Sequence, residues 1–463
     1  MPTHSSWTPR IESPASVRRF LAWMAVGSIA LLVYASLIPL DYTPLSWDET
    51  RQQWRNIPWF DLQVFHRADW VANALVVLPS GVLASAAVSW GRPKWWPLLA
   101  AAPFISLLLA AVVIGIELAQ VWFPTRTVSL NDIVAGVIGA AVAPILWILA
   151  GRHVERGITR FLTLPSFEDR LKWLCVGYLG FILIYTLLPL DFVVSYEEWQ
   201  LRLATGNVRW NPFAGEFSAE YAVRGLTLSA VRMAPLGLLL ALISRPRLAG
   251  WTLLLLPIAF ELLQIPLFSK HATTIEVLGG WLGGSFGYFV GTSLHYFRRI
   301  VQRPVLWGLL WIVAYAATVA AFLLRHDQVL RDSTEIAQRF RDAWALPLVK
   351  YYSGSEYSAY TNVAAKIALF AVLGTFALGW QRTARSRTGI AVFWLTLTVV
   401  SITAFSIELL QVFLPPLVPD ISDAFTYLFG YAAGYQIARI LWGGTPSPHV
   451  GMAWVDAAFR GVL

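Results

Sequence analysis

Long apolar runs alternate with short polar segments along the whole chain. A run of about 18 or more mainly apolar residues is long enough to cross the hydrocarbon core of a bilayer as an α-helix. The runs predict an all-α, polytopic transmembrane helical bundle. Twelve spans are expected near residues 20–40, 68–90, 97–120, 130–150, 172–190, 224–243, 249–267, 275–296, 304–324, 359–380, 388–413 and 422–442.

The charges between the runs predict the orientation of the spans. Lys and Arg are concentrated in alternate segments, at residues 10–19, 92–94, 245–247, 298–303 and 382–387. Because cytoplasmic segments carry the excess of basic residues, both termini are expected in the cytoplasm. We expect a multi-pass protein of the cell membrane with cytoplasmic tails at 1–19 and 443–463 and a cytoplasmic linker at 151–171.

Composition agrees with a membrane protein. Of the 463 residues, 57% are hydrophobic and 13% are charged, and the mean hydropathy is +0.58, which is outside the range of ordinary soluble domains. The 35 Lys and Arg against 27 Asp and Glu are read as orientation signals, and no nucleic-acid partner is expected. The single cysteine, Cys175, forms neither a disulfide framework nor a thiolate metal site. The histidines lack metal-ligand spacing, so no metal and no cofactor are expected.

A polar motif recurs three times, as IELAQVWFP at 116–124, FELLQIPLF at 260–268 and IELLQVFLP at 407–415. Each copy has Gln three positions after Glu and an acid twelve positions after that Gln. An even number of spans separates the copies, so the repeats have parallel orientation. The motif predicts three parallel four-helix units, at 20–150, 172–297 and 304–442.

Further marks share this register: SLIPLD at 36–41 matches TLLPLD at 186–191, and NALVVLPSG at 73–81 matches SAVRMAPLG at 229–237. The third unit is expected to be degenerate, because it has no PLD at this register. In addition, Lys366 stands where Asn73 would be, and Leu417 replaces Arg126.

An outer Asp, an Asn before PxG, ExxQ, a basic residue and a following Asp with small-residue spacing together resemble the VanZ-like family of membrane proteins. This family is named for an accessory protein of glycopeptide resistance associated with teicoplanin. The resemblance covers most of the chain as three tandem units and is closest in the first. It implies four-span units and a cell-envelope role, and it implies no particular reaction.

The polar residues of each unit belong to the outer ends of its spans, where carboxylates are costly and by default mark function or a paired contact. For Asp132, Glu276 and Asp423 the main expected role is as the acid of a helix capping box. For the ExxQ glutamates, a clamp with Arg126 or Lys270 and a ligand site are both open. Glycines in the fourth span of each unit predict close helix packing. The candidate ligand-binding set is Asp41, Asn73, Glu117, Gln120, Arg126, Asp132, Asp191, Glu261, Gln264, Lys270, Glu276, Glu408, Gln411 and Asp423.

Three functions are compatible with this pattern. The first is a protein that binds or protects a lipid-linked envelope component at the outer leaflet, or that confers tolerance of teicoplanin-type lipoglycopeptides; its partner is a membrane lipid or a lipid-linked envelope precursor. The second is a membrane enzyme acting on a lipid-linked substrate with Glu117 as general base. A transporter fits less well, because the inner halves of the spans carry almost no ionisable groups. The sequence leaves the oligomeric state open.

Overall fold

The described residues are helical apart from loops and one pair of two-residue strands. The computed structural model describes residues 13–58, 64–163, 167–204, 208–209, 219–296, 303–323, 330, 332–344, 346–353, 356–384, 386–415 and 417–441. The long helices are α1 (Pro14–Leu37), α3 (Val64–Ser89), α4 (Trp96–Ala119), α5 (Leu130–Thr163), α6 (Phe167–Leu187), α8 (Ala219–Ile243), α9 (Pro246–Gln264), α10 (Thr274–Tyr296), α12 (Pro304–Leu323), α14 (Glu356–Thr383), α15 (Ser386–Gln411) and α16 (Ile421–Leu441).

The shorter elements lie between the long helices. Three are outer helices with capped starts, and two are single 3₁₀ turns. The parallel strands pair Val208 with Ala272 and Arg209 with Thr273. These elements are α2 (Trp47–Arg55), α7 (Tyr196–Ala204), α13 (Ser333–Ala343), η1 (Gln120–Trp122), η2 (Val349–Ser353), β1 (Val208–Arg209) and β2 (Ala272–Thr273).

Each of the twelve predicted ranges falls on a long helix. Within the described residues, nine helices are long and apolar enough to cross a membrane. The corresponding segments are Pro14–Leu37, His66–Ser89, Trp96–Trp122, Leu130–Phe161, Glu168–Leu187, Ala222–Ile243, Pro246–Gln264, Thr361–Thr383 and Arg387–Gln411. The apolar part of α12 is shorter, at Pro304–Ala320. The chain is therefore a multi-pass helical protein with the dimensions of a membrane bundle.

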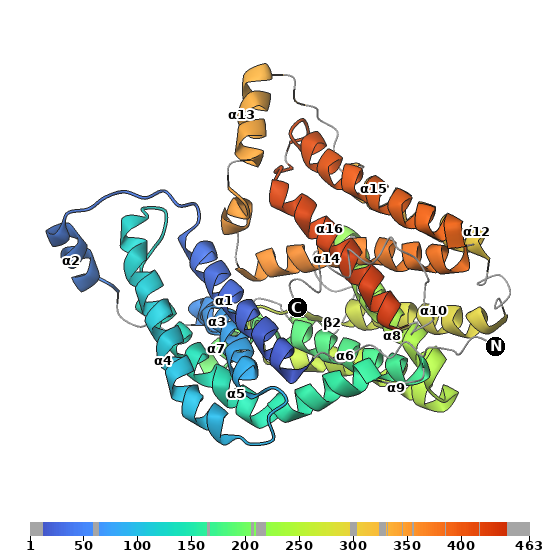
Figure 1. The fold of residues 1–463 in the computed structure, drawn as a ribbon, viewed down its shortest axis with the longest axis horizontal. Helices are drawn as coiled ribbons and strands as arrows, with labels where there is room; N and C mark the ends of the chain where they lie inside the picture. Colours follow the sequence, from blue (N-terminus) through green and yellow to red (C-terminus); the bar gives the residue numbers. More distant parts are fainter. Residues whose placement is uncertain are drawn as a thin grey trace. The chain divides into compact units, whose positions relative to one another are not determined.

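The chain divides into two compact units. One comprises Met1–Asp61, Ala72–Leu162 and Gln302–Leu463, and the other comprises Leu62–Val71 and Thr163–Val301. Within the larger unit the hydroxyl of Tyr34, in α1, donates to the carbonyl oxygen of Pro347 at 2.8 Å. Figure 1 shows α15 and α16 running side by side in this unit, with α13 beyond one end of α15.

The hydrophobic core consists of separate clusters, and each large cluster draws on four consecutive long helices. One cluster joins α1, α3, α4 and α5, a second joins α6, α8, α9 and α10, and a third joins α12, α14, α15 and α16. Representative buried side chains are Leu32, Val77, Leu109 and Ala140 in the first, Ile182, Leu236 and Phe260 in the second, and Trp311, Phe370, Val400 and Tyr427 in the third.

The second and fourth helices of each group lie backbone against backbone, because a glycine on the fourth faces the main chain of the second. A side chain at this glycine would collide with the carbonyl group of its neighbour. In each group the glycine is seven residues after the acid of the motif, so the contact keeps one register. The predicted close packing of small residues is thereby confirmed. The three contacts are Gly139 on Ala74, Gly283 on Ala230 and Gly430 on Ile367.

Local sequence explains several helix ends. The hydroxyl of Ser13 caps α1 and is followed by Pro14 at the first helical position, where proline loses no hydrogen bond. Ser46 and Glu49 form a complete capping box at the start of α2. Ser195 and Glu198 exchange the same pair of bonds at the start of α7. These boxes fix short amphipathic helices in the segments between the long helices.

Candidate functional site

A buried glutamate joins the end of the third helix of each group to the start of the fourth. All three ExxQ glutamates are less than a tenth exposed. Each accepts a hydrogen bond from the backbone N–H of the residue just before the fourth helix. A carboxylate suits this position, because it satisfies an orphan amide and complements the helix dipole. The donors are Ser129 to Glu117 (3.4 Å), Thr273 to Glu261 (2.9 Å) and Asp420 to Glu408 (2.8 Å).

This arrangement corrects the predicted capping boxes. The sequence predicts that Asp132, Glu276 and Asp423 reach back to the cap residue, but its N–H donates to the ExxQ glutamate instead. In the second group one of the two capping-box bonds is present: the N–H of Glu276 donates to the hydroxyl of Thr273 at 3.4 Å. The buried glutamate arrives from the preceding helix, which a local motif does not reveal. The first-turn acid is left to bond elsewhere.

The glutamines of the motif orient the glutamates or tie helices together. Gln264 donates to Glu261 at 3.0 Å, and Gln411 donates to Glu408 at 3.3 Å. Gln120 instead reaches the carbonyl of Ser36 in α1, at 3.1 Å. All three glutamines are buried, so the ExxQ motif forms an internal polar network at one end of each bundle.

The first-turn acid of the fourth helix pairs with a polar residue of the second helix in every group. In the first group the amide of Asn73 donates to Asp132 at 2.5 Å. In the second group Arg232 forms an ion pair with Glu276 at 3.3 Å, and Ser229 donates to the carbonyl of Glu276 at 2.6 Å. The third group replaces these partners with a lysine. Asn73, Ser229 and Lys366 stand at equivalent positions, and in the second group Arg232, three residues after Ser229, supplies the cation that pairs with the acid.

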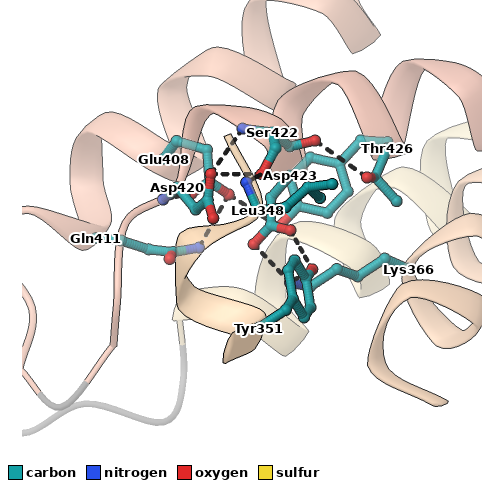
Figure 2. Close-up of polar contacts among 10 residues, drawn as sticks. Leu348, Tyr351, Lys366, Glu408, Gln411, Asp420, Ser422, Asp423 and Thr426 are labelled. Carbon is teal, nitrogen blue, oxygen red and sulfur yellow. Dashed lines mark hydrogen bonds and ion pairs between the residues drawn. The ribbon is translucent and has the colours of Figure 1, made fainter. Parts of the chain in front are cut away.

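The third group has the most connected network, although its motifs are the most altered. Lys366 forms an ion pair with Asp423 at 2.5 Å and donates to the hydroxyl of Tyr351 at 2.8 Å. Tyr351 in turn donates to Asp423. Figure 2 shows the carboxylate of Asp423 directed at both partners. Burial, and then the negative charge of Asp423, raise the pKa of Tyr351, so its phenol stays protonated. Tyr427 donates to Glu408 at 2.9 Å.

The aspartates of the two PLD turns bind the loop after the ExxQ helix. The hydroxyl of Thr125 donates to Asp41 at 2.9 Å, and the N–H of Ser269 donates to Asp191 at 2.9 Å. Both donors stand five residues after the motif glutamine. Both turns also contain a cis peptide bond before proline and a leucine with a φ of 65°. The turn therefore anchors the outer loop to the bundle in the first and second groups.

The basic residues of this loop extend toward the first helix. Arg126 donates to the carbonyl of Ala35 at 2.6 Å. Lys270 approaches the carbonyl of Tyr185 at 3.4 Å and lies 5.3 Å from the centre of its ring. Burial lowers the pKa of Lys270. The sequence leaves open a clamp of these cations with Glu117 and Glu261 or a ligand site, and it does not indicate the contacts with main-chain carbonyls.

Sequence reasoning missed two arginines, of which Arg202 is buried and Arg339 is half-buried. Arg202, in α7, donates to the carbonyls of Gln264, Ile265 and Phe268. Arg339, in α13, donates to the carbonyls of Gln411, Val412 and Leu417. Each guanidinium thus satisfies the carboxyl end of an ExxQ helix. Their position in the sequence could have revealed them, because each arginine stands seven residues after the N-cap residue of the short helix that carries it.

Two buried carboxylates keep one oxygen without a donor among the described residues. These are Oδ1 of Asp191 and Oδ2 of Asp420, and both side chains are at most 3% exposed. A buried acceptor of this kind is costly unless a donor reaches it. No group of three or more metal-binding side chains occurs within the described parts of the chain.

Long apolar helices with polar networks at their ends define a multi-pass integral membrane protein. The family model described as VanZ/LLP1 matches residues 11–151 and 307–442, which is more than half of the chain. The chain belongs to the VanZ/LLP1 family, as its motifs predicted. The matched ranges contain the first and third groups of helices. No curated protein and no solved structure matches the chain.

Proposed function

We propose that the chain forms three tandem four-helix units with twelve spans, at residues 20–150, 172–297 and 304–442. The recurring glutamate cap, the recurring pair between second and fourth helices and the three separate cores support this architecture. We also propose that both termini are cytoplasmic in the cell membrane, because the basic segments are at the ends opposite the polar networks.

We propose that the polar ends bind the headgroup of a membrane amphiphile, such as a lipid-linked envelope precursor, at the extracytoplasmic face. One observation carries this proposal: Asp191 and Asp420 each keep a buried carboxylate oxygen without a donor. A hydroxyl or ammonium group of a bound headgroup supplies that donor. Lys366, beside Asp423 in the third unit, supplies a cation for an anionic part of the same headgroup.

The surroundings of the site suit a ligand with an apolar chain. Aromatic side chains are exposed on or beside the outer helices, notably Trp47, Tyr196 and Trp344, at 61%, 74% and 51%. Indole and phenol rings favour the headgroup region of a bilayer. A lipid-tailed glycopeptide such as teicoplanin has the same combination of a polar head and an apolar chain. Tolerance of such antibiotics is the proposed consequence of binding.

The geometry favours binding over the enzyme and transporter alternatives. Glu117, the proposed general base of an enzyme, accepts the backbone N–H of Ser129 and caps α5. The cations Arg232 and Lys366 pair with acids in the first turn of α10 and α16, which puts them near helix ends. A transport path requires such groups near the midplane.

Native mass spectrometry of the gently extracted protein tests the binding proposal. The variants are Asp420→Asn and Asp191→Asn, which keep the size of each side chain and remove the charge. Asp342→Asn is the matched control, because Asp342 is exposed on α13. Wild type and control should retain a defined lipid-linked species, and the two buried variants should lose it.

The opposite result would count against the proposal. If all four proteins keep the same bulk phospholipid while remaining folded, the unpartnered oxygens do not select a headgroup. Intrinsic tryptophan fluorescence and size-exclusion chromatography verify folding before each measurement.

A further inference from the structure

A hollow lies at the opposite end of the first bundle from the ExxQ network. It is a shallow, open hollow with a cavity volume of about 20 Å³, and the space in front of it is continuous with its surroundings. The α3–α4 loop forms one wall and α5 forms the other. Its lining includes Ser89, Arg92, Lys94, Trp95, Trp147 and Arg152.

The length of α5 puts this hollow at the other membrane surface. Asp132 is in the first turn of α5, and Arg152 is twenty residues later in the same helix. At 1.5 Å per residue the two are about 30 Å apart, which is the thickness of the hydrocarbon core. The hollow therefore lies where a bilayer has its second layer of headgroups.

The walls are held by specific contacts. Trp147 donates from its indole nitrogen to the hydroxyl of Ser89 at 2.8 Å. Arg152 donates to the carbonyl of Pro93 at 2.7 Å, and its guanidinium lies 4.6 Å from the centre of the Trp95 ring. Arg152 is therefore held facing the loop, and two indoles frame the space.

The loop itself is fixed by one residue that needs to be glycine. Gly91 has a φ of +68°, and a side chain there would collide with Pro14. Its N–H donates to the carboxylate of Glu155 at 2.8 Å. This bond occupies the only acidic side chain of the lining, so the three cations dominate the charge of the hollow.

Arg92 and Lys94 remain available for a ligand. Both side chains are exposed, and neither forms a hydrogen bond or an ion pair with another residue that the structure describes. With Arg152 already oriented by Trp95, the hollow presents three cations and aromatic walls to a group entering from the bilayer surface. An anion with a phosphate matches this arrangement, because guanidinium and ammonium groups form charge-assisted bonds to phosphate oxygens.

We propose that this hollow binds the phosphate of an anionic phospholipid headgroup in the leaflet opposite the ExxQ networks. Basic pockets between membrane helices are suited to anionic headgroups, and tryptophan rings favour the same layer of the bilayer. The cations hold the phosphate, and the exposed apolar faces of α4 and α5, which include Leu99 and Leu149, accompany the acyl chains. This site uses no residue of the outer networks.

The test compares retention of phosphatidylglycerol and phosphatidylcholine by the full-length protein in nanodiscs, using native mass spectrometry. The variant is Arg92→Gln with Lys94→Gln, and the matched control is Arg245→Gln with Arg247→Gln, an exposed basic pair in the α8–α9 turn. Each lost cation should weaken retention of phosphatidylglycerol roughly fivefold, and the pair about 30-fold. Wild type and control should prefer phosphatidylglycerol equally.

Two results would overturn the proposal. One is equal loss of phosphatidylglycerol in variant and control, which would indicate a general effect of charge. The other is full displacement of the lipid by millimolar inorganic phosphate, which would identify a free-anion site. If the variant with Arg92→Gln and Lys94→Gln still retains the lipid-linked species proposed for the ExxQ ends, the failure concerns this hollow alone. The binding proposed for the ExxQ ends then stands independently.

Discussion

Removal of the lysine at the centre of the third network gives the sharpest stability test. Lys366 is the only cation that the structure pairs with Asp423, and the side chains are 15% and 6% exposed. The substitution Lys366→Met keeps the apolar stem and removes the charge. Asp423 then retains the hydroxyl of Tyr351 as a donor but loses its counter-charge.

The expected cost follows from the uncompensated carboxylate. Breaking a buried pair by removing one partner costs about 3–5 kcal/mol. Because Tyr351 still donates to Asp423, we expect about 3 kcal/mol, the lower end of that range. Adding Asp423→Asn removes the second charge as well. The double variant should therefore be more stable than Lys366→Met alone.

Unfolding in a titration of denaturing detergent, followed by tryptophan fluorescence, measures both variants. Lys172→Met is the control, since Lys172 pairs with exposed acids in α6 and should leave the midpoint unchanged. A single variant as stable as wild type, or a double variant less stable than the single one, would show that the pair is not a buried charge pair in the folded protein.

Three further predictions follow from other contacts. Arg67, together with the backbone N–H groups of Val194 and Ser195, holds the pKa of Glu198 below its ordinary value of 4.5, so Glu198 adds stability above pH 4.5 that is lost as pH falls further; in acid titration of unfolding, Arg67→Met should reduce that dependence. Gly283→Ala should cost about 2 kcal/mol by collision with the facing main chain, whereas Gly115→Ala, with open space around it, should be neutral in the same detergent titration. Arg202→Ala leaves three carbonyls without their donor and should cost about 3 kcal/mol, measured as a lowered unfolding midpoint.

The sequence predicted the positions of the long helices because hydrophobic length is a strong signal in membrane proteins. It also predicted the family, since its motifs, among them the spacing from Glu117 to Asp132, are present in the chain. Close packing at Gly139 was predictable for the same reason. The short outer helices were less visible, because they are amphipathic and contain few residues.

The partners of the polar residues were harder to predict than their locations. A capping box is a local pattern, and the glutamate that replaces its acid comes from the preceding helix. Arg202 binds carbonyls about sixty residues away in the chain, and no local spacing indicates such a contact. Side-chain pairing across helices depends on crossing geometry, which hydropathy does not contain.

The third unit, which the sequence predicts to be degenerate, also shows that motifs do not reveal the partners of polar residues. Lys366 departs from the amide and hydroxyl at the equivalent positions, yet it bonds the same first-turn acid. Motif loss therefore changed the charge of the pair and kept its geometry. A residue that departs from the motif can occupy the same contact.

Each of the three networks contains residues that stabilise the helix bundle and residues that determine the charge at its end. The ExxQ glutamate performs one task in every unit, because it always caps the fourth helix. The partner of the first-turn acid differs in every unit, from Asn73 to Arg232 to Lys366. A scaffold requires the constant contact, whereas a second-helix partner that differs in charge from unit to unit alters what a headgroup meets at each bundle end. Ligand selectivity is therefore expected to follow substitutions of the second-helix residue, and loss of the glutamate is expected to lower stability before it changes selectivity.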